Sequence, residues 1–182
     1  IAALKPTDSQ PLLRLAEAQL LNNDPGLAAQ SLRRALTINP DLVIAQQGLV
    51  RVAMLGKRVD DALQIAKTVQ KQRPKEAIGF QMEGEIYLAQ RNVEHAQMAF
   101  KLALEREPTT NNATRVHALY AGAGRQVEAD RLAESWLKSR PTDAAFLFYL
   151  GTAAMTRSDY PSAEARYRQL LALQPDNAST LN

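Results

Sequence analysis

The side chains that could carry catalysis in this chain are few and widely separated. Cysteine is absent, which excludes thiol catalysis, disulfides and cysteine–zinc sites. The two histidines, His95 and His117, have no second histidine or carboxylate cluster beside them at the spacing of metal ligands. We expect His95 to lie in solvent early in a helix, and His117 to be a hydrogen-bonded structural residue on the packing face of another helix. No metal site is predicted.

The sequence also lacks a catalytic carboxylate pair and the usual phosphate-binding and nucleophile motifs. Asp60 and Asp61 are adjacent, and neighbouring residues on a helix point about 100° apart, so they cannot work as a catalytic pair. We interpret them as acidic residues in the first turn of a helix, where the helix dipole stabilises negative charge. The sequence contains no G-x-x-x-x-G-K-[ST] loop, no G-x-G-x-x-G turn and no G-x-S-x-G elbow. It therefore predicts a protein that is not an enzyme and has no cofactor.

Composition narrows the possible partners. The chain is 46% hydrophobic and 23% charged, which is ordinary for a folded protein, and its net charge is only +3. Basic residues are interspersed with acids and form no stripe with aromatics, so no nucleic-acid partner is predicted. No run approaches the roughly 18–20 apolar residues of a membrane span, so no membrane-spanning segment is predicted.

The elements that position these residues follow from an internal repeat. Two residue types recur in phase along the chain, at intervals of 34, 34, 34, 33 and 34 for proline and 34, 34, 33 and 34 for alanine. A 34-residue period is typical of tandem helix–turn–helix units. The prolines are Pro6, Pro40, Pro74, Pro108, Pro141 and Pro175, and the alanines are Ala28, Ala62, Ala96, Ala129 and Ala163.

Aligned on these markers, the sequence predicts a single array, residues 1–182, which we interpret as a fragment of a longer repeat protein. Each repeat comprises a helix A, a turn, a helix B and a proline-marked turn. The five repeats span 9–42, 43–76, 77–110, 111–143 and 144–177, with partial repeats at 1–8 and 178–182.

Local signals place the helix ends and contacts. Asp24 precedes a proline and should cap a helix B, while Asp41, Asp143 and Asp176 should cap helices A. Small residues recur at the eighth place of a repeat, where helices A and B should approach closely. These residues are Ala16, Gly84, Ala118 and Gly151.

The fourth repeat departs from this pattern. It is one residue short, and Gly122 and Gly124 predict an early end to its helix A. It also carries Trp136 where other repeats have a small alanine. We expect the shortened helix A to make room for the indole, a compensated packing in which Trp136 has a structural role rather than a functional one.

This pattern resembles the tetratricopeptide repeat (TPR) along essentially the whole chain. The resemblance implies an all-α fold, a right-handed α-solenoid of five helix–turn–helix units with partial flanking helices. It also implies a concave groove, lined by one face of helices A, that binds a protein or an extended or helical peptide. Alternatively, some of the apolar lining residues pack on the next repeat. The predicted groove residues are Leu13, Glu17, Leu20, Gln47, Arg51, Met54, Gln81, Met82, Glu85, Arg115, Leu119, Phe148, Tyr149 and Thr152.

One known use of such a groove is disfavoured. TPR co-chaperones hold a C-terminal carboxylate with a Lys/Asn/Arg clamp at these places. The matching positions here are Leu13, Glu17, Gly48, Ile78 and Met82, so the clamp is absent.

Several longer strings resemble a narrower family, best over residues 60–182. They are KQRPK, RVHALYAGAGRQVEADRLAESWLKSRPTDAAFLFYLG and SDYPSAEARYRQLLALQPDNASTLN. They are similar to the TPR lipoproteins encoded with bacterial exosortase (PEP-CTERM) protein-sorting systems. The resemblance implies a lipid-anchored array that faces the periplasm and assists exopolysaccharide-linked envelope protein sorting.

Two other interpretations stay open. The chain could be a cytoplasmic regulatory or sensor module that binds a peptide or small ligand, or a spacer whose ligand binds elsewhere. The sequence does not fix the identity of the ligand or the oligomeric state.

Overall fold

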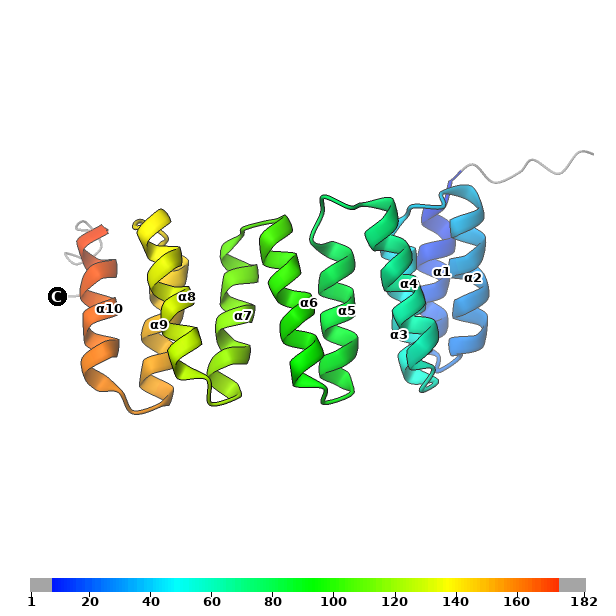
Figure 1. The fold of residues 1–182 in the computed structure, drawn as a ribbon. Coiled ribbons are helices and arrows are strands. Elements are labelled where there is room, and N and C mark those ends of the chain that lie inside the picture. The colour runs from blue at the N-terminus through cyan, green and yellow to red at the C-terminus, as the bar shows by residue number, and fades with distance from the viewer. Residues whose placement is uncertain (1–7, 174–182) are drawn as a thin grey trace, which may run out of the picture. The chain divides into compact units, whose positions relative to one another are not determined.

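The computed structural model describes residues 8–173, and within that range all regular structure is helical (Figure 1). The chain divides between Glu107 and Pro108 into two compact units, which we call the N-terminal unit and the C-terminal unit. The N-terminal unit contains α1 (Gln10–Leu21), α2 (Pro25–Ile38), α3 (Val43–Leu55), α4 (Val59–Gln72), α5 (Ile78–Ala89) and α6 (Val93–Arg106). The C-terminal unit contains α7 (Thr110–Gly122), α8 (Gln126–Ser139), α9 (Ala144–Thr156) and α10 (Tyr160–Leu173). Each predicted repeat contains one helical hairpin, and their assembly into one continuous array stays a prediction.

The turn between the two helices of each hairpin has the same geometry. It is three residues long, and its middle residue has a left-handed backbone, with φ of 59° at Asn23, 56° at Lys57, 58° at Arg91, 71° at Gly124 and 60° at Ser158. This conformation costs a non-glycine residue about 1–2 kcal/mol. Because only the fourth turn uses glycine, the packing of the two helices, rather than the turn residue, sets the geometry.

Glycines let two of the hairpins close tightly. A Cβ built at Gly84 of α5 would lie 2.6 Å from the Phe100 ring of α6, and one at Gly151 of α9 would lie 2.7 Å from the Tyr167 ring of α10. Neither position can hold a larger side chain unless the ring moves. Ala16 is likewise buried in the first hairpin. The predicted close approach at Ala16, Gly84 and Gly151 is therefore confirmed.

The fourth hairpin differs from these. α7 ends four residues after Ala118, whereas α1 and α9 end five residues after Ala16 and Gly151, so the predicted early end is confirmed. The prediction that Ala118 lies at the helix crossing is wrong, because its side chain is exposed. α7 instead turns the neighbouring His117 inward, where it is buried.

Arginines close two hairpins at the end opposite the turn. In the α3–α4 hairpin, Arg73 donates from Nη2 to the backbone oxygen of Asp41 at 3.1 Å. In the α7–α8 hairpin, Arg140 donates from Nη2 to the backbone oxygen of Pro108 at 3.3 Å. Each arginine follows the last residue of its helix B and reaches back to the start of helix A. We call these contacts the arginine staples.

The predicted helix caps are confirmed in part. Asp24 and Asp143 each accept a hydrogen bond from the backbone amide three residues on, at 3.2 and 3.0 Å. The cap predicted at Asp41 is wrong, because α3 begins two residues later and the Asp41 carboxylate lies 3.5 Å from Arg73 instead. Asp176 lies outside the described residues. The first turn of α4 carries Asp60 and Asp61, as predicted.

Candidate functional site

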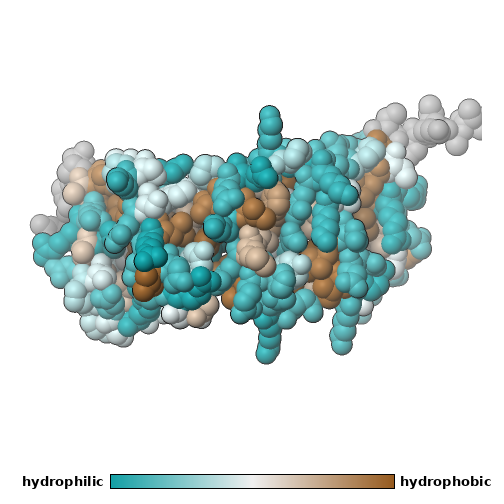
Figure 2. Space-filling view, viewed as in Figure 1, coloured by the Kyte–Doolittle hydropathy of each residue, from teal (hydrophilic) through white to brown (hydrophobic). Residues whose placement is uncertain are grey.

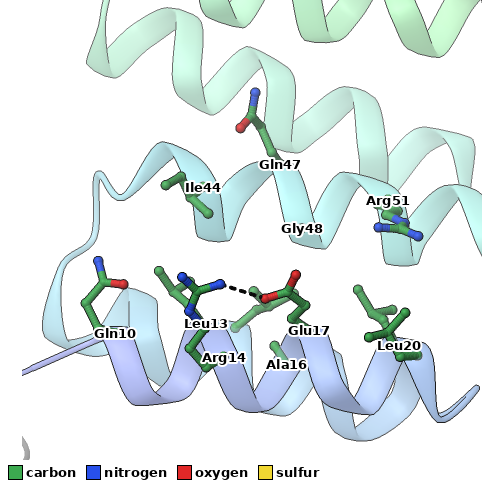
Figure 3. Close-up of a pocket in the computed structure, with 12 residues that line it drawn as sticks. Gln10, Leu13, Arg14, Ala16, Glu17, Leu20, Ile44, Gln47, Gly48 and Arg51 are labelled. Carbon is green, nitrogen blue, oxygen red and sulfur yellow. Dashed lines mark hydrogen bonds and ion pairs between the residues drawn. The ribbon is translucent and has the colours of Figure 1, made fainter.

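A groove of about 510 Å³ lies between α1 and α3 in the N-terminal unit. Figure 3 shows side chains of α1 facing those of α3 across this space. We call it the α1–α3 groove. Five predicted ligand-binding residues line it together, namely Leu13, Glu17 and Leu20 from α1, and Gln47 and Arg51 from α3.

The floor of the α1–α3 groove is apolar. It includes Leu32 of α2, which packs beneath Gly48, where a Cβ would lie 2.9 Å from the leucine methyl groups. Exposed apolar side chains continue to the edge, with Leu21 83% and Ile44 60% exposed. On the face drawn in Figure 2, hydrophilic side chains predominate and apolar ones show mainly in seams between them. The groove thus offers accessible apolar surface within a largely polar exterior.

Charges line the edge of the same groove. Arg14 and Glu17 form an exposed ion pair, with Nη1 3.0 Å from Oε2, which Figure 3 marks as a dashed line. Arg51 forms no ion pair with any residue between 8 and 173. Its guanidinium is therefore available to an acidic group on a ligand.

The predicted groove residues farther along the N-terminal unit do not join this cavity. Met54 is half-buried against the cluster that contains Val69, Gln81 is half-buried, and Glu85 is exposed. Met82 is only 6% exposed and belongs to that cluster itself, so it offers no surface to a ligand.

The burial of Met82 corrects the prediction and has a physical cause. Gly79 lies so close to α4 that a Cβ there would meet Gln70 at 2.7 Å. Met82 is three residues after Gly79 and shares its helix face, which this close approach turns toward the core.

In the C-terminal unit, two of the predicted residues, Phe148 and Thr152, lie on α9 beside Tyr167 of α10. Phe148 is 58% exposed, and its ring centroid lies 6.1 Å from that of Tyr167. The exposed Thr152 hydroxyl lies 3.2 Å from the Tyr167 hydroxyl. Arg115 and Leu119 are half-buried on α7.

Tyr149, the remaining predicted residue, is occupied within the fold. Its hydroxyl lies 2.9 Å from Nδ1 of His117, and the two rings meet edge to face with centroids 5.3 Å apart. Burial, reinforced by the positive charge of Arg157, lowers the pKa of His117 to about 4. Burial also raises the pKa of Tyr149. The predicted structural role of His117 is confirmed, as is the exposure of His95.

Trp136 is held by a hydrogen-bonded carboxylate that the sequence did not reveal. Asp143 Oδ2 accepts hydrogen bonds from Trp136 Nε1 at 2.8 Å and from the Thr110 hydroxyl at 2.7 Å. Burial alone would raise the pKa of Asp143, but these hydrogen bonds and the nearby Arg140 outweigh it and hold the pKa below its ordinary value. The Arg140 guanidinium also stacks over the indole, 4.1 Å from its centroid. The predicted compensated packing of Trp136, which is buried, is confirmed.

Between residues 8 and 173, no group of three His, Asp or Glu side chains is placed to hold a metal ion. In the same range, no helix has the length and apolar character that crossing a bilayer requires.

The helical hairpins and the α1–α3 groove define a helical repeat protein with an accessible face on helices A. Comparison with known families identifies the type of repeat. Three family models described as tetratricopeptide repeat match residues 19–83, 79–110 and 119–178. The chain therefore carries tetratricopeptide repeats, and the predicted all-α solenoid class is confirmed. Proteins built from these repeats are generally non-enzymatic scaffolds for protein–protein interaction.

Solved structures share the fold at low sequence identity. A thermophilic TPR protein of Thermus thermophilus is 22% identical, with 94% of each chain covered and a TM-score of 0.57. YrrB, described as a TPR protein with an unusual peptide-binding site, is 17% identical, with 96% of this chain and 93% of that chain covered and a TM-score of 0.52. Yeast Tom70 is 16% identical, with 93% of this chain but 37% of that chain covered and a TM-score of 0.69. No curated protein matches the sequence.

Proposed function

We propose that this chain is a scaffold whose α1–α3 groove binds an extended peptide segment of a partner protein. The observation that carries the proposal is the meeting of five predicted ligand-binding residues around one cavity of about 510 Å³. A cavity of this size falls in the range of ligand sites in proteins, which are mostly apolar with a few placed polar groups. The description of YrrB as having a peptide-binding site gives independent support for peptide recognition by this fold.

The lining indicates the chemistry of the peptide. Leu13, Leu20 and the exposed Ile44 favour apolar side chains such as leucine. Arg51, which lacks an ion-pair partner among residues 8–173, favours one acidic residue beside them. Glu17 is already paired with Arg14 and adds little attraction for a basic residue. The preferred ligand is therefore a leucine-containing segment with a single acid.

Fluorescence anisotropy tests this preference directly. One probe is a fluorescein-labelled decapeptide that alternates leucine and serine around a central glutamate, and a second probe carries lysine in place of the glutamate. We expect the glutamate probe to bind more tightly, and Arg51→Glu to weaken it about tenfold, which corresponds to roughly 1.4 kcal/mol. Arg34→Glu, an exposed charge reversal on α2 that lies outside the groove, is the matched control.

The outcomes separate the parts of the proposal. Equal binding of both probes would contradict the role of Arg51. Unchanged binding in a Leu20→Glu variant whose circular dichroism matches wild type would contradict the groove itself.

For the cellular role, we propose a lipid-anchored scaffold at the periplasmic face of a bacterial envelope, assisting PEP-CTERM/exosortase sorting and exopolysaccharide-linked export. The support for this role is the resemblance of the sequence strings between residues 60 and 182 to the TPR lipoproteins encoded with exosortase systems. A crosslinking pull-down from the native envelope, comparing the full protein with its Leu20→Glu, Arg51→Glu variant, tests it. Capture of exported or sorting proteins by wild type alone supports the role. Fractionation of the full protein with the cytoplasm would contradict it and favour the regulatory-module alternative.

A further inference from the structure

A second cavity, of about 260 Å³, lies in the C-terminal unit between α8 and the α9–α10 hairpin. Its inner surface includes the buried side chains of His117, Leu150 and Ala154. One water occupies about 30 Å³ in the liquid, so the space admits a small organic molecule rather than a single water. None of the predicted groove residues lines it. We call it the α8–α10 cavity.

The two walls of the α8–α10 cavity carry opposite charges. Asp130 and Glu134 lie four residues apart on α8 and so share one helix face. Arg157, at the end of α9, and Arg166, on α10, supply the other wall. Asp159 also lines the cavity, but its carboxylate caps α10 by accepting the Ser162 amide at 3.2 Å. The cavity is therefore negative on the α8 side, and the opposite side, with two arginines and one carboxylate, has a net positive charge.

These four charged side chains are not paired with one another. Among residues 8–173 no ion pair joins Asp130 or Glu134 to either arginine. Asp130 accepts a hydrogen bond from Gln126 at 2.7 Å through Oδ1, and Arg166 donates to Gln169 at 3.1 Å. Each retains further hydrogen-bonding capacity toward the cavity.

The buried histidine adds a polar group to the inner surface. His117 is 2% exposed, and its Nδ1 is engaged by the Tyr149 hydroxyl. Its Nε2 forms no hydrogen bond with any residue of the described range, although the ring lines the cavity. Because Nε2 faces the cavity rather than being sealed in the core, water or a ligand there can satisfy its hydrogen bond.

The equivalent cavity of the N-terminal unit provides an internal comparison. By register on the repeated alanines, Ala29 and Ile65 occupy the places of Asp130 and Arg166. Arg33 occupies the place of Glu134 there, and the other two charged lining residues, Arg58 and Asp61, are paired with each other at 3.4 Å. The separated charges are therefore particular to the α8–α10 cavity rather than a property of the repeat.

We propose that the α8–α10 cavity binds a small zwitterion of the free α-amino acid class. The ligand carboxylate pairs with Arg157 and Arg166, its ammonium pairs with Asp130 and Glu134, and the His117 ring lies beneath the ligand. Both charges of the ligand are needed, because an anion alone would face the two α8 carboxylates and a cation alone would face the two arginines. The site is independent of the α1–α3 groove.

Two-dimensional ¹H–¹⁵N NMR of the intact chain tests the proposal. The probes are L-alanine, L-leucine, L-glutamine and L-arginine, with propionate and ethylammonium as singly charged controls at equal concentration. We expect at least one amino acid to cause saturable shifts at the amides of Ala133 and Ser162, on opposite walls. We expect Arg166→Ile, which reproduces the residue of the N-terminal unit, to weaken that binding at least tenfold.

Matched variants keep the result interpretable. Arg168 lies on the same helix, pairs with Glu164 and does not line the cavity. The Arg168→Ile variant should therefore bind the amino acid as tightly as wild type. Asp130→Asn preserves shape and removes one charge of the opposite wall, so it should also weaken binding even if Arg166→Ile fails to fold. Arg51→Glu should leave amino-acid binding unchanged, which separates this site from the peptide groove.

Three results would overturn the proposal. They are the absence of saturable shifts with all four amino acids, equal shifts with propionate alone, and undiminished binding in both Arg166→Ile and Asp130→Asn. The first would mean that the arginines close onto the α8 carboxylates in solution.

Discussion

The buried His117 should make the C-terminal unit sensitive to mild acid. The groups that face its ring are Tyr149 on α9, Arg157 directly after α9, Asp130 on α8 and Arg166 on α10. Burial and the two arginines favour the neutral ring and outweigh the attraction of Asp130, which gives a folded-state pKa of about 4 against 6.5 for an ordinary histidine. Protonation therefore favours the unfolded state. The stabilisation is complete above pH 6.5 and declines as pH falls toward 4.

The magnitude follows from this pKa difference. One pKa unit corresponds to about 1.36 kcal/mol, so full protonation removes about 3 kcal/mol from the free energy of unfolding. Between pH 7 and pH 5, the same linkage gives a loss of about 2 kcal/mol. Asp143 and Asp159 have lowered pKa values, and their stabilisation declines only as pH falls below the ordinary range of carboxyl groups near 4. The window from pH 7 to pH 5 thus isolates the histidine.

Urea unfolding followed by tryptophan fluorescence measures this loss. Trp136 is the only tryptophan in the chain and lies in the same unit as His117, so its emission reports that unit. His117→Asn should lower stability at pH 7 but remove most of its decline between pH 7 and pH 5. His95→Asn, at the exposed histidine, should keep the wild-type decline. An equal decline in wild type and His117→Asn, or a His117 ring that titrates near pH 6.5 by NMR, would refute the reasoning.

Three further substitutions probe the packing, each by urea unfolding followed by circular dichroism. Gly84→Ala should lower the free energy of unfolding by about 1–3 kcal/mol, because the added methyl group overlaps the Phe100 ring. Adding Phe100→Leu should recover part of this loss. An unchanged free energy of unfolding in Gly84→Ala would mean that the two helices separate freely. Asp143→Ala should cost about 2–4 kcal/mol and shift the emission of Trp136, because it removes the helix cap and the partner of the buried indole. Lys57→Gly should raise stability by up to about 1 kcal/mol by relieving the left-handed turn, whereas a decrease would show that turn flexibility dominates.

The fold was accessible from the sequence because its determinants are local and repeated. Period-marking prolines end helices, and the small residues Gly84 and Gly151 face the partner helix at the same place in each repeat. Such signals need only the spacing within one hairpin. The α1–α3 groove was predicted through the resemblance to the TPR, because Leu13 and Glu17 lie at helix A positions that line the groove in that family.

The contacts that the sequence did not predict connect different repeats or depend on exact helix rotation. His117 meets Tyr149, 32 residues away in the next repeat, and no local pattern links the two. Asp143 was predicted as a cap, but its second oxygen binds Trp136 across a turn. Met82 lies at a helix A position that the TPR resemblance assigns to the groove, yet the close approach of α5 to α4 buries its side chain. Period-based reasoning gives the helices but not their rotation about their own axes.

The arginine staples imply that the hairpins do not all open with equal ease. The staples of Arg73 and Arg140 are hydrogen bonds from partly exposed guanidinium groups, whereas Gly84 and Gly151 hold aromatic rings against bare backbone. Surface hydrogen bonds exchange readily with water, and buried ring contacts are lost only when the helices part. The starts of α3 and α7 can therefore fray while the rest of each hairpin persists. Amide hydrogen exchange is therefore expected to begin at these points.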